Sequence, residues 1–135
     1  MTPQDLTGLY HGYIDCLNRR DWDDLPRLVA EDVRYNGALL GLGGYRAMLV
    51  ADVRAIPDLR FTLLQLVCEP PVVAVRLGFD CTPTGLLFGL PVNGRRVQFS
   101  ENVFYDIAGG RIGAVWSVID KAAVAAQIGA APSGG

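Results

Sequence analysis

The residue best suited by type and position to do chemistry is Glu101, an acid on the apolar side of a predicted strand. Around it, Val97, Phe99, Val103 and Tyr105 alternate with polar residues from Gln98 to Asp106, the period of a half-buried strand. Either this register is misread by one residue, or the carboxylate lies in an apolar hollow. Burial raises the pKa of a carboxyl group toward neutrality, which suits proton transfer next to a carbonyl group. Glu101 is therefore a candidate general base or acid.

Three helices are predicted before the sheet, and the first begins at Thr2-Pro3-Gln4-Asp5, a typical helix start. Its Tyr13 is either a core tyrosine, which the buried face favours, or a hydroxyl in a pocket. His11, the single histidine, falls on the opposite face and is expected to be solvated. The apolar positions at helical spacing are Leu6, Leu9, Tyr10, Tyr13, Ile14 and Leu17.

Asp21 is expected to cap a second, short helix, and a short strand is expected at 33–35. The apolar face of that helix is expected to comprise Trp22, Leu25, Leu28 and Val29. The glycine-rich segment 36–44 is expected to be a flexible rim, since it lacks the glycine spacing of a nucleotide loop. A third helix follows, with Tyr45, Met48, Leu49 and Val53 on one face, and it ends before Ile56-Pro57.

The remaining chain predicts strands at 59–67, 72–81, 97–106 and 112–119, with a tight turn at 108–111. Arg76 and Asp80 share a face of the second strand and are best interpreted as a solvated ion pair. The last strand is apolar on both sides, so it is central or meets another chain. One side comprises Ile112, Ala114, Trp116 and Val118, and the other comprises Val115 and Ile119.

Helices followed by strands predict an α+β fold: a cone-shaped, curved antiparallel sheet packed against N-terminal helices, with a pocket between them. We expect one domain over residues 1–129, including a last helix at 122–128, and a disordered tail at 130–135.

Composition excludes several classes of function. The net charge of −2 gives no case for binding nucleic acid or an anionic membrane. No apolar run is long enough to span a membrane, and no signal peptide is recognisable, so a cytoplasmic location is expected. With one histidine and three scattered cysteines, which we expect to be reduced, no metal site is predicted.

The order of these motifs resembles the SnoaL-like polyketide cyclases and predicted ester cyclases of the nuclear transport factor 2-like superfamily. Residues 13–22 are similar to the first family helix, which ends in N-x-x-D, and Ile56-Pro57-Asp58-Leu59-Arg60 is similar to fPDlr. Residues 89–97, GLPVNGRRV, are similar to GiPpTGrrv. Gly110-Arg111-Ile112 and residues 116–120, WSVID, complete the pattern. The resemblance implies the α+β fold and a cofactor-independent cyclase that closes rings by intramolecular aldol chemistry.

The family's charged positions are replaced in this chain. The aspartate of the last strand falls on Ser117, and the acidic or histidine position of the preceding strand falls on Val103. Two further motif histidines fall on Pro83 and Val115. Tyr13 occupies the place of an oxyanion-binding tyrosine in ketosteroid isomerases, whose base would fall near Gly37.

The resulting hypothesis is a lyase- or isomerase-type enzyme acting on a hydrophobic carbonyl compound, without metal or cofactor. Glu101 would transfer the proton, while Tyr13 and Asn36 would donate hydrogen bonds to the enolate oxygen. The substrate would be bound by Tyr35, Phe99, Val103, Tyr105, Val115 and Ser117.

Two alternatives stay open. In the first, the domain binds a hydrophobic ligand, or only dimerises, without catalysis; the replacements at Val103, Val115 and Ser117 favour this interpretation. In the second, the protein is a hydroxylase- or epoxide-hydrolase-type member of the superfamily, and epoxide opening would need Arg76 and Asp80 to face inward. In each case the partners expected are a small hydrophobic molecule and a second copy of the chain, because Trp116 and Val118 need cover.

Overall fold

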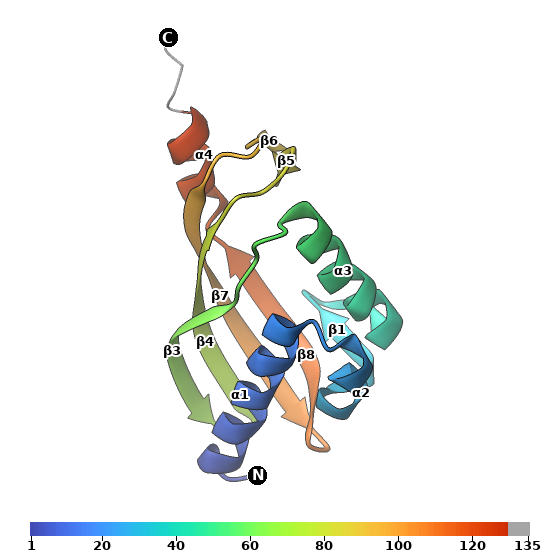
Figure 1. Ribbon diagram of the computed structural model, residues 1–135. Coiled ribbons are helices and arrows are strands. Elements are labelled where there is room, and N and C mark those ends of the chain that lie inside the picture. Colours follow the sequence, from blue (N-terminus) through green and yellow to red (C-terminus); the bar gives the residue numbers. More distant parts are fainter. Residues whose placement is uncertain (130–135) are drawn as a thin grey trace.

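One mixed six-stranded sheet organises the protein, whose computed structural model describes residues 1–129. The helices α1 and α3 lie over one face of the sheet, and α4 closes one end (Figure 1). The strand order is β2-β1-β8-β7-β4-β3. The strands are β1 (Val29–Tyr35), β2 (Ala38–Leu39), β3 (Thr62–Glu69), β4 (Val72–Cys81), β7 (Val97–Ala108) and β8 (Arg111–Ile119).

The α+β fold is as the sequence predicts, but the sheet is not wholly antiparallel. β1 runs parallel to β8, whereas the other neighbouring pairs are antiparallel. Hairpins force antiparallel pairing only between strands that follow each other closely. Because most of the chain lies between β1 and β8, no such constraint acts on this pair.

Helix α1 (Pro3–Arg19) begins at the predicted cap and covers the sheet with its predicted face. The Asp5 amide donates to Thr2 Oγ1 at 3.1 Å, and the Thr2 amide donates to Asp5 Oδ2 at 2.8 Å. Near the other end, the Asn18 side chain bonds both backbone groups of Phe61, at 2.9 and 2.7 Å. These bonds fix α1 beside the start of β3. His11 is exposed, as expected.

The segment after α1 differs from the predicted second helix. A 3₁₀ turn at Trp22–Asp24 leads into a four-residue helix, α2 (Leu25–Leu28). Asp21 makes no side-chain capping bond, and Val29 belongs to strand β1, where it pairs with Ile112. The β-branched valine thus continues into the sheet, which ends the helix early.

The predicted flexible rim is a short hairpin followed by a helix. Asn36 and Gly37 have φ values of 49° and 87° and form the two-residue turn between β1 and β2. This conformation is the one that tight hairpins need, and Asn-Gly is its most favoured sequence. Helix α3 (Gly41–Ala55) then begins before Tyr45 and packs against β1.

A bulge in β8 corrects the predicted sides of that strand. Asp106 pairs with Ala114 while Ile107 pairs with Ile112, so Gly113 is an extra residue. A bulge moves the residues beyond it to the other face. Ile112 is therefore fully buried in the core, whereas Trp116 and Val118 are exposed.

The predicted Arg76–Asp80 ion pair does not form. Asp80 instead accepts two hydrogen bonds from the Arg96 guanidinium, with Nη2 at 2.5 Å from Oδ2. Arg76 and Asp80 are both exposed, so they do not supply the inward-facing set that an epoxide hydrolase would need.

Between β4 and β7 the chain forms a small hairpin, β5 (Leu86–Leu87) and β6 (Leu90–Pro91). It lies close to the C-terminal end of α3 and to α4 (Lys121–Gly129) in Figure 1. Arg95 and Gln98 hold α4 there through bonds to Gln127. The predicted tail, 130–135, lies outside the described residues. No helix among the described residues has the length and apolarity to cross a membrane.

Candidate functional site

An apolar pocket of about 110 Å³ lies between α1, α3, the sheet and the β5–β6 hairpin. Most of the residues predicted for the site line it, whereas Asn36 and Ser117 are not among its lining residues. The lining residues that the sequence predicts are Tyr13, Tyr35, Phe99, Glu101, Val103, Tyr105 and Val115.

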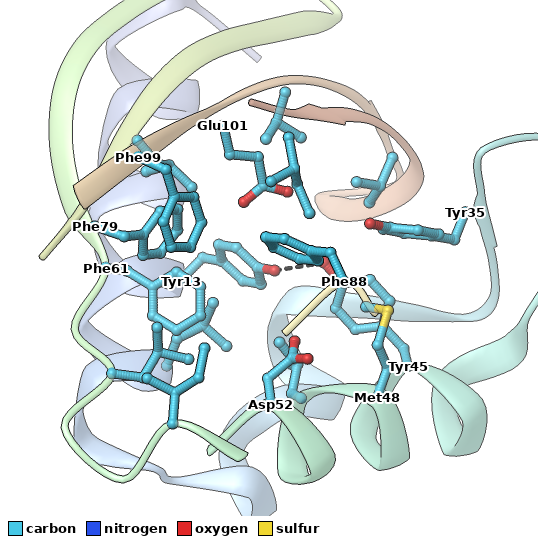
Figure 2. Close-up of a pocket in the computed structure, with 18 of the residues that line it drawn as sticks. Tyr13, Tyr35, Tyr45, Met48, Asp52, Phe61, Phe79, Phe88, Phe99 and Glu101 are labelled. Carbon is cyan, nitrogen blue, oxygen red and sulfur yellow. Dashed lines mark hydrogen bonds between the residues drawn. The ribbon is translucent and has the colours of Figure 1, made fainter. Parts of the chain in front are cut away.

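Glu101 lies on the helix-facing side of β7, between Phe99 and Val103, and points into the pocket (Figure 2). The Ser117 hydroxyl donates a short hydrogen bond to Glu101 Oε2. Burial raises the pKa of Glu101, the Ser117 bond lowers it, and the negative charge of Asp52 raises it; the net direction is upward. Once ionised, the Glu101 carboxylate is therefore a stronger base than the carboxylate of a solvent-exposed glutamate.

Ser117 is itself fixed by Asn36, which lies on the turn after β1. The Ser117 amide donates to Asn36 Oδ1 at 2.8 Å, and Asn36 Nδ2 approaches the Ser117 carbonyl at 3.4 Å. Both polar atoms of the Asn36 side chain thus contact strand β8. Because Asn36 is not among the residues that line the pocket, positioning of Ser117 fits this geometry better than the predicted role of hydrogen-bond donor to substrate.

Two tyrosines from different helices form a hydrogen-bonded pair in the pocket. The hydroxyls of Tyr13 (α1) and Tyr45 (α3) are 2.5 Å apart. Burial raises the pKa of both phenols, so they remain protonated at neutral pH. One of the two protons bridges the oxygens, which leaves the other free to donate to a ligand. A second pair, Tyr10 and Tyr105, lies at 3.1 Å between α1 and β7.

Asp52 is a pocket residue that the sequence reasoning missed. It lies on α3, and its carboxylate points into the pocket from the wall opposite Glu101 (Figure 2). Although much of the residue is exposed, partial burial raises the pKa of its carboxyl group to about 6. The signal was present in the sequence, because Asp52 follows Tyr45, Met48 and Leu49 at helical spacing.

Phe88, at the tip of the β5–β6 hairpin, lies between Glu101 and the helices (Figure 2). It has a left-handed backbone, with φ of 53°, and its ring packs edge-on against Phe99 at 5.6 Å. The Lys121 ammonium lies over the face of the Phe88 ring, 5.5 Å from the ring centre. Positive φ is unfavourable for an aromatic residue, so packing holds this side chain over the pocket.

The pocket carries negative but no positive side chains. Glu101 and Asp52 are its acids, and no lysine, arginine or histidine of residues 1–129 lines it. Among the described residues, no three His, Cys, Asp or Glu side chains lie close enough together to hold a metal ion. The arrangement suits an uncharged ligand and proton transfer between carboxyl and hydroxyl groups.

Comparisons with known proteins agree with this architecture. Residues 7–128 match the family described as SnoaL-like polyketide cyclase. The crystal structure of a SnoaL-like polyketide cyclase from Agrobacterium tumefaciens shares 48% sequence identity, with a TM-score of 0.91 over 95% of this chain and 99% of that one. TsrD from Streptomyces laurentii, at 23% identity and a TM-score of 0.84, shares the fold over 96% of this chain and 98% of its own. Among curated proteins, none matches this chain.

The Asp52 carboxyl group predicts a specific dependence of stability on pH. Its pKa of about 6 in the folded protein exceeds the ordinary value of 3.8, so the folded state holds this proton more tightly than the unfolded state. The contribution of Asp52 to the free energy of unfolding is therefore fully present below about pH 4 and is lost as the pH rises through 6. Replacing Asp52 by Asn should make stability relative to the parent rise between pH 4 and pH 7, measured by urea unfolding.

Asp58→Asn provides a control of opposite sign. Hydrogen bonds, first of all from the Thr82 amide, lower the pKa of Asp58, so its stabilising contribution is present above pH 4 and is lost on acidification. Relative to the parent, this variant should therefore show a level difference in stability between pH 4 and pH 7, and the difference should shrink only as the pH falls below 4. A level difference for Asp52→Asn between pH 4 and pH 7 would contradict the burial assigned to Asp52.

Proposed function

This chain belongs to the SnoaL-like polyketide cyclase family, and we propose that it is a cofactor-independent enzyme acting on a neutral, hydrophobic carbonyl compound. Glu101 is the general base in this proposal. The observation that carries it is the position of the Glu101 carboxylate, which faces a tyrosine pair across an apolar pocket. Removing a proton next to a carbonyl group needs both a base and a donor for the developing oxyanion.

The contact between Glu101 and Ser117 supports this assignment. The family resemblance leads one to expect an acid at the position of Ser117, on the last strand. Here the acid comes from the neighbouring strand, and its carboxylate reaches the Ser117 hydroxyl. The carboxylate therefore serves the same region of the pocket from a different backbone position.

The tyrosine pair supplies the oxyanion donor. With one proton shared between Tyr13 and Tyr45, the remaining hydroxyl proton can bond the carbonyl oxygen of a substrate. Charge develops on that oxygen when Glu101 removes the neighbouring proton. The surrounding apolar walls exclude water and strengthen this hydrogen bond in the transition state.

Ligand binding without catalysis is the second candidate. Val103 and Val115 lie where the family resemblance leads one to expect acidic or histidine side chains. Phe88 occupies space next to Glu101 in the pocket. A pocket of this kind can hold an apolar ring without reacting with it. Under this alternative, a hydrophobic ketone binds and raises the melting temperature, but its protons do not exchange.

Substitution of Glu101 separates the two candidates. With 1-indanone in D₂O, the parent should accelerate exchange of the α-protons, followed by ¹H NMR. Glu101→Gln should slow this exchange by about 10²–10⁴-fold, the usual contribution of general base catalysis. Asp106→Asn, an exposed acid on the same strand, should leave the rate within a few-fold. A Glu101→Gln rate close to that of the parent would exclude the proposed base.

We also propose that a second copy of the chain covers the outer face of the sheet. Phe104 lies directly opposite Trp116 in the β7–β8 pairing, and both side chains are about half exposed. With Val118, at 71% exposure, they form an apolar surface on one face of two neighbouring strands. A contiguous apolar surface of this kind favours association, and a patch without net charge can pair with itself about a twofold axis.

Sedimentation measures this association directly. The parent should sediment at twice the mass of the chain at micromolar concentration, whereas the double variant Phe104→Lys/Trp116→Lys should sediment as a monomer. Leu86→Lys changes a leucine that is more exposed than either aromatic residue and lies outside the six-stranded sheet, and it should leave the dimer intact. A monomeric parent, or a double variant that still dimerises, would contradict the proposal.

A further inference from the structure

We infer that Asp52 is a second catalytic residue, the general acid that delivers a proton to the substrate from the wall opposite Glu101. This inference rests on the proposed function, and it adds a donor to the base and the oxyanion contact described above. It stands first on geometry. The two carboxylates enter the same pocket from different layers, Glu101 from the sheet and Asp52 from α3 (Figure 2).

The surroundings of Asp52 leave its carboxyl group available. It has no hydrogen bond or ion pair with a side chain of residues 1–129, in contrast to Asp80 and Asp24, which are paired with arginines. Although much of the residue is exposed, its carboxylate points into the apolar pocket, where no paired side chain offsets the cost of its partial burial. A reaction in the pocket gives a reason for an acid in this orientation.

The groups that face Asp52 are phenols and an acid. From α3 and β1 they are Tyr45 and Tyr35, from α1 Tyr13, and from β7 Glu101. No cation of the described pocket competes for its proton. Partial burial holds the pKa of Asp52 at about 6, so a usable fraction of the group is protonated near neutral pH, as a general acid requires.

Two carboxyl groups on opposite walls of one pocket can divide the proton transfers of an intramolecular aldol reaction between them. Glu101 removes a proton from the carbon next to one carbonyl group, and the enolate oxygen is held by the tyrosine pair. The enolate carbon then forms a bond to a second carbonyl carbon, whose π electrons move to its oxygen. Asp52 gives its proton to that alkoxide. The product is an isomeric β-hydroxyketone, and transfer of the proton from Glu101 to Asp52, directly or through water, restores the enzyme.

Heptane-2,6-dione reports the two halves of this reaction separately. Exchange of its α-protons in D₂O measures proton removal, and formation of 3-hydroxy-3-methylcyclohexanone measures ring closure, both by NMR. Asp52→Asn should keep exchange within a few-fold of the parent while slowing closure by about 10²-fold or more. Glu101→Gln should slow both steps together, and Asp106→Asn should slow neither.

Each outcome bears on a different claim. If the parent catalyses neither step, the proposed function fails and this inference fails with it. If the parent catalyses both steps and Asp52→Asn closes the ring at the parental rate, the proposed function stands and Asp52 is not the acid. Loss of exchange and closure together in a folded Asp52→Asn protein would also overturn the assignment.

A second measurement does not depend on a substrate. ¹³C NMR titration of the carboxyl groups should show a lower pKa for Glu101 in Asp52→Asn than in the parent. The variant lacks the negative charge of Asp52, which raises the pKa of Glu101 in the parent. An unchanged Glu101 titration would mean that the two acids do not share the pocket, which the inference requires.

Discussion

The hydrogen bond from Ser117 to Glu101 holds a carboxylate inside an apolar pocket, and three elements are arranged to keep it in place. Ser117 lies on β8, the strand that pairs with both β7 and β1. Its backbone is bonded to the side chain of Asn36, on the turn that follows β1. Glu101 comes from β7, one diagonal step away across the sheet. The register of three strands therefore fixes the position of one acid, and a slip by one residue would turn Glu101 away from the pocket.

The sequence predicted those features that depend on local chemistry. The capping box at Thr2 and Asp5, the strand at 72–81 and the Gly109-Gly110 turn all follow from short patterns whose physical basis lies within a few residues. The side of β7 that carries Glu101 followed from simple alternation. The hairpin at Asn36-Gly37 was equally local, but the glycines around it led to the interpretation of a flexible rim.

Other features depend on the tertiary structure and were out of reach. The bulge at Gly113 moves Ile112 to the buried side only because β8 must pair with β7 beyond it. The parallel pairing of β1 with β8 joins residues far apart in the chain. Phe88 over the pocket could not be foreseen either, since a hairpin of two-residue strands has no clear periodicity. Asp52 differs from these cases, because its helical spacing from Tyr45, Met48 and Leu49 was visible in the sequence. It was missed because an acidic residue is not expected on the buried face of a helix.

The account of function depends on where a carbonyl oxygen binds. A crystal structure with 2-naphthol, whose oxygen and adjacent carbon imitate an enolate, measures this directly. The account predicts the naphthol oxygen within about 3 Å of the Tyr13 and Tyr45 hydroxyls, with the neighbouring ring carbon beside the Glu101 carboxylate. A ligand seated in this pocket with its oxygen turned away from the tyrosine pair, or bound only on another surface, would contradict it.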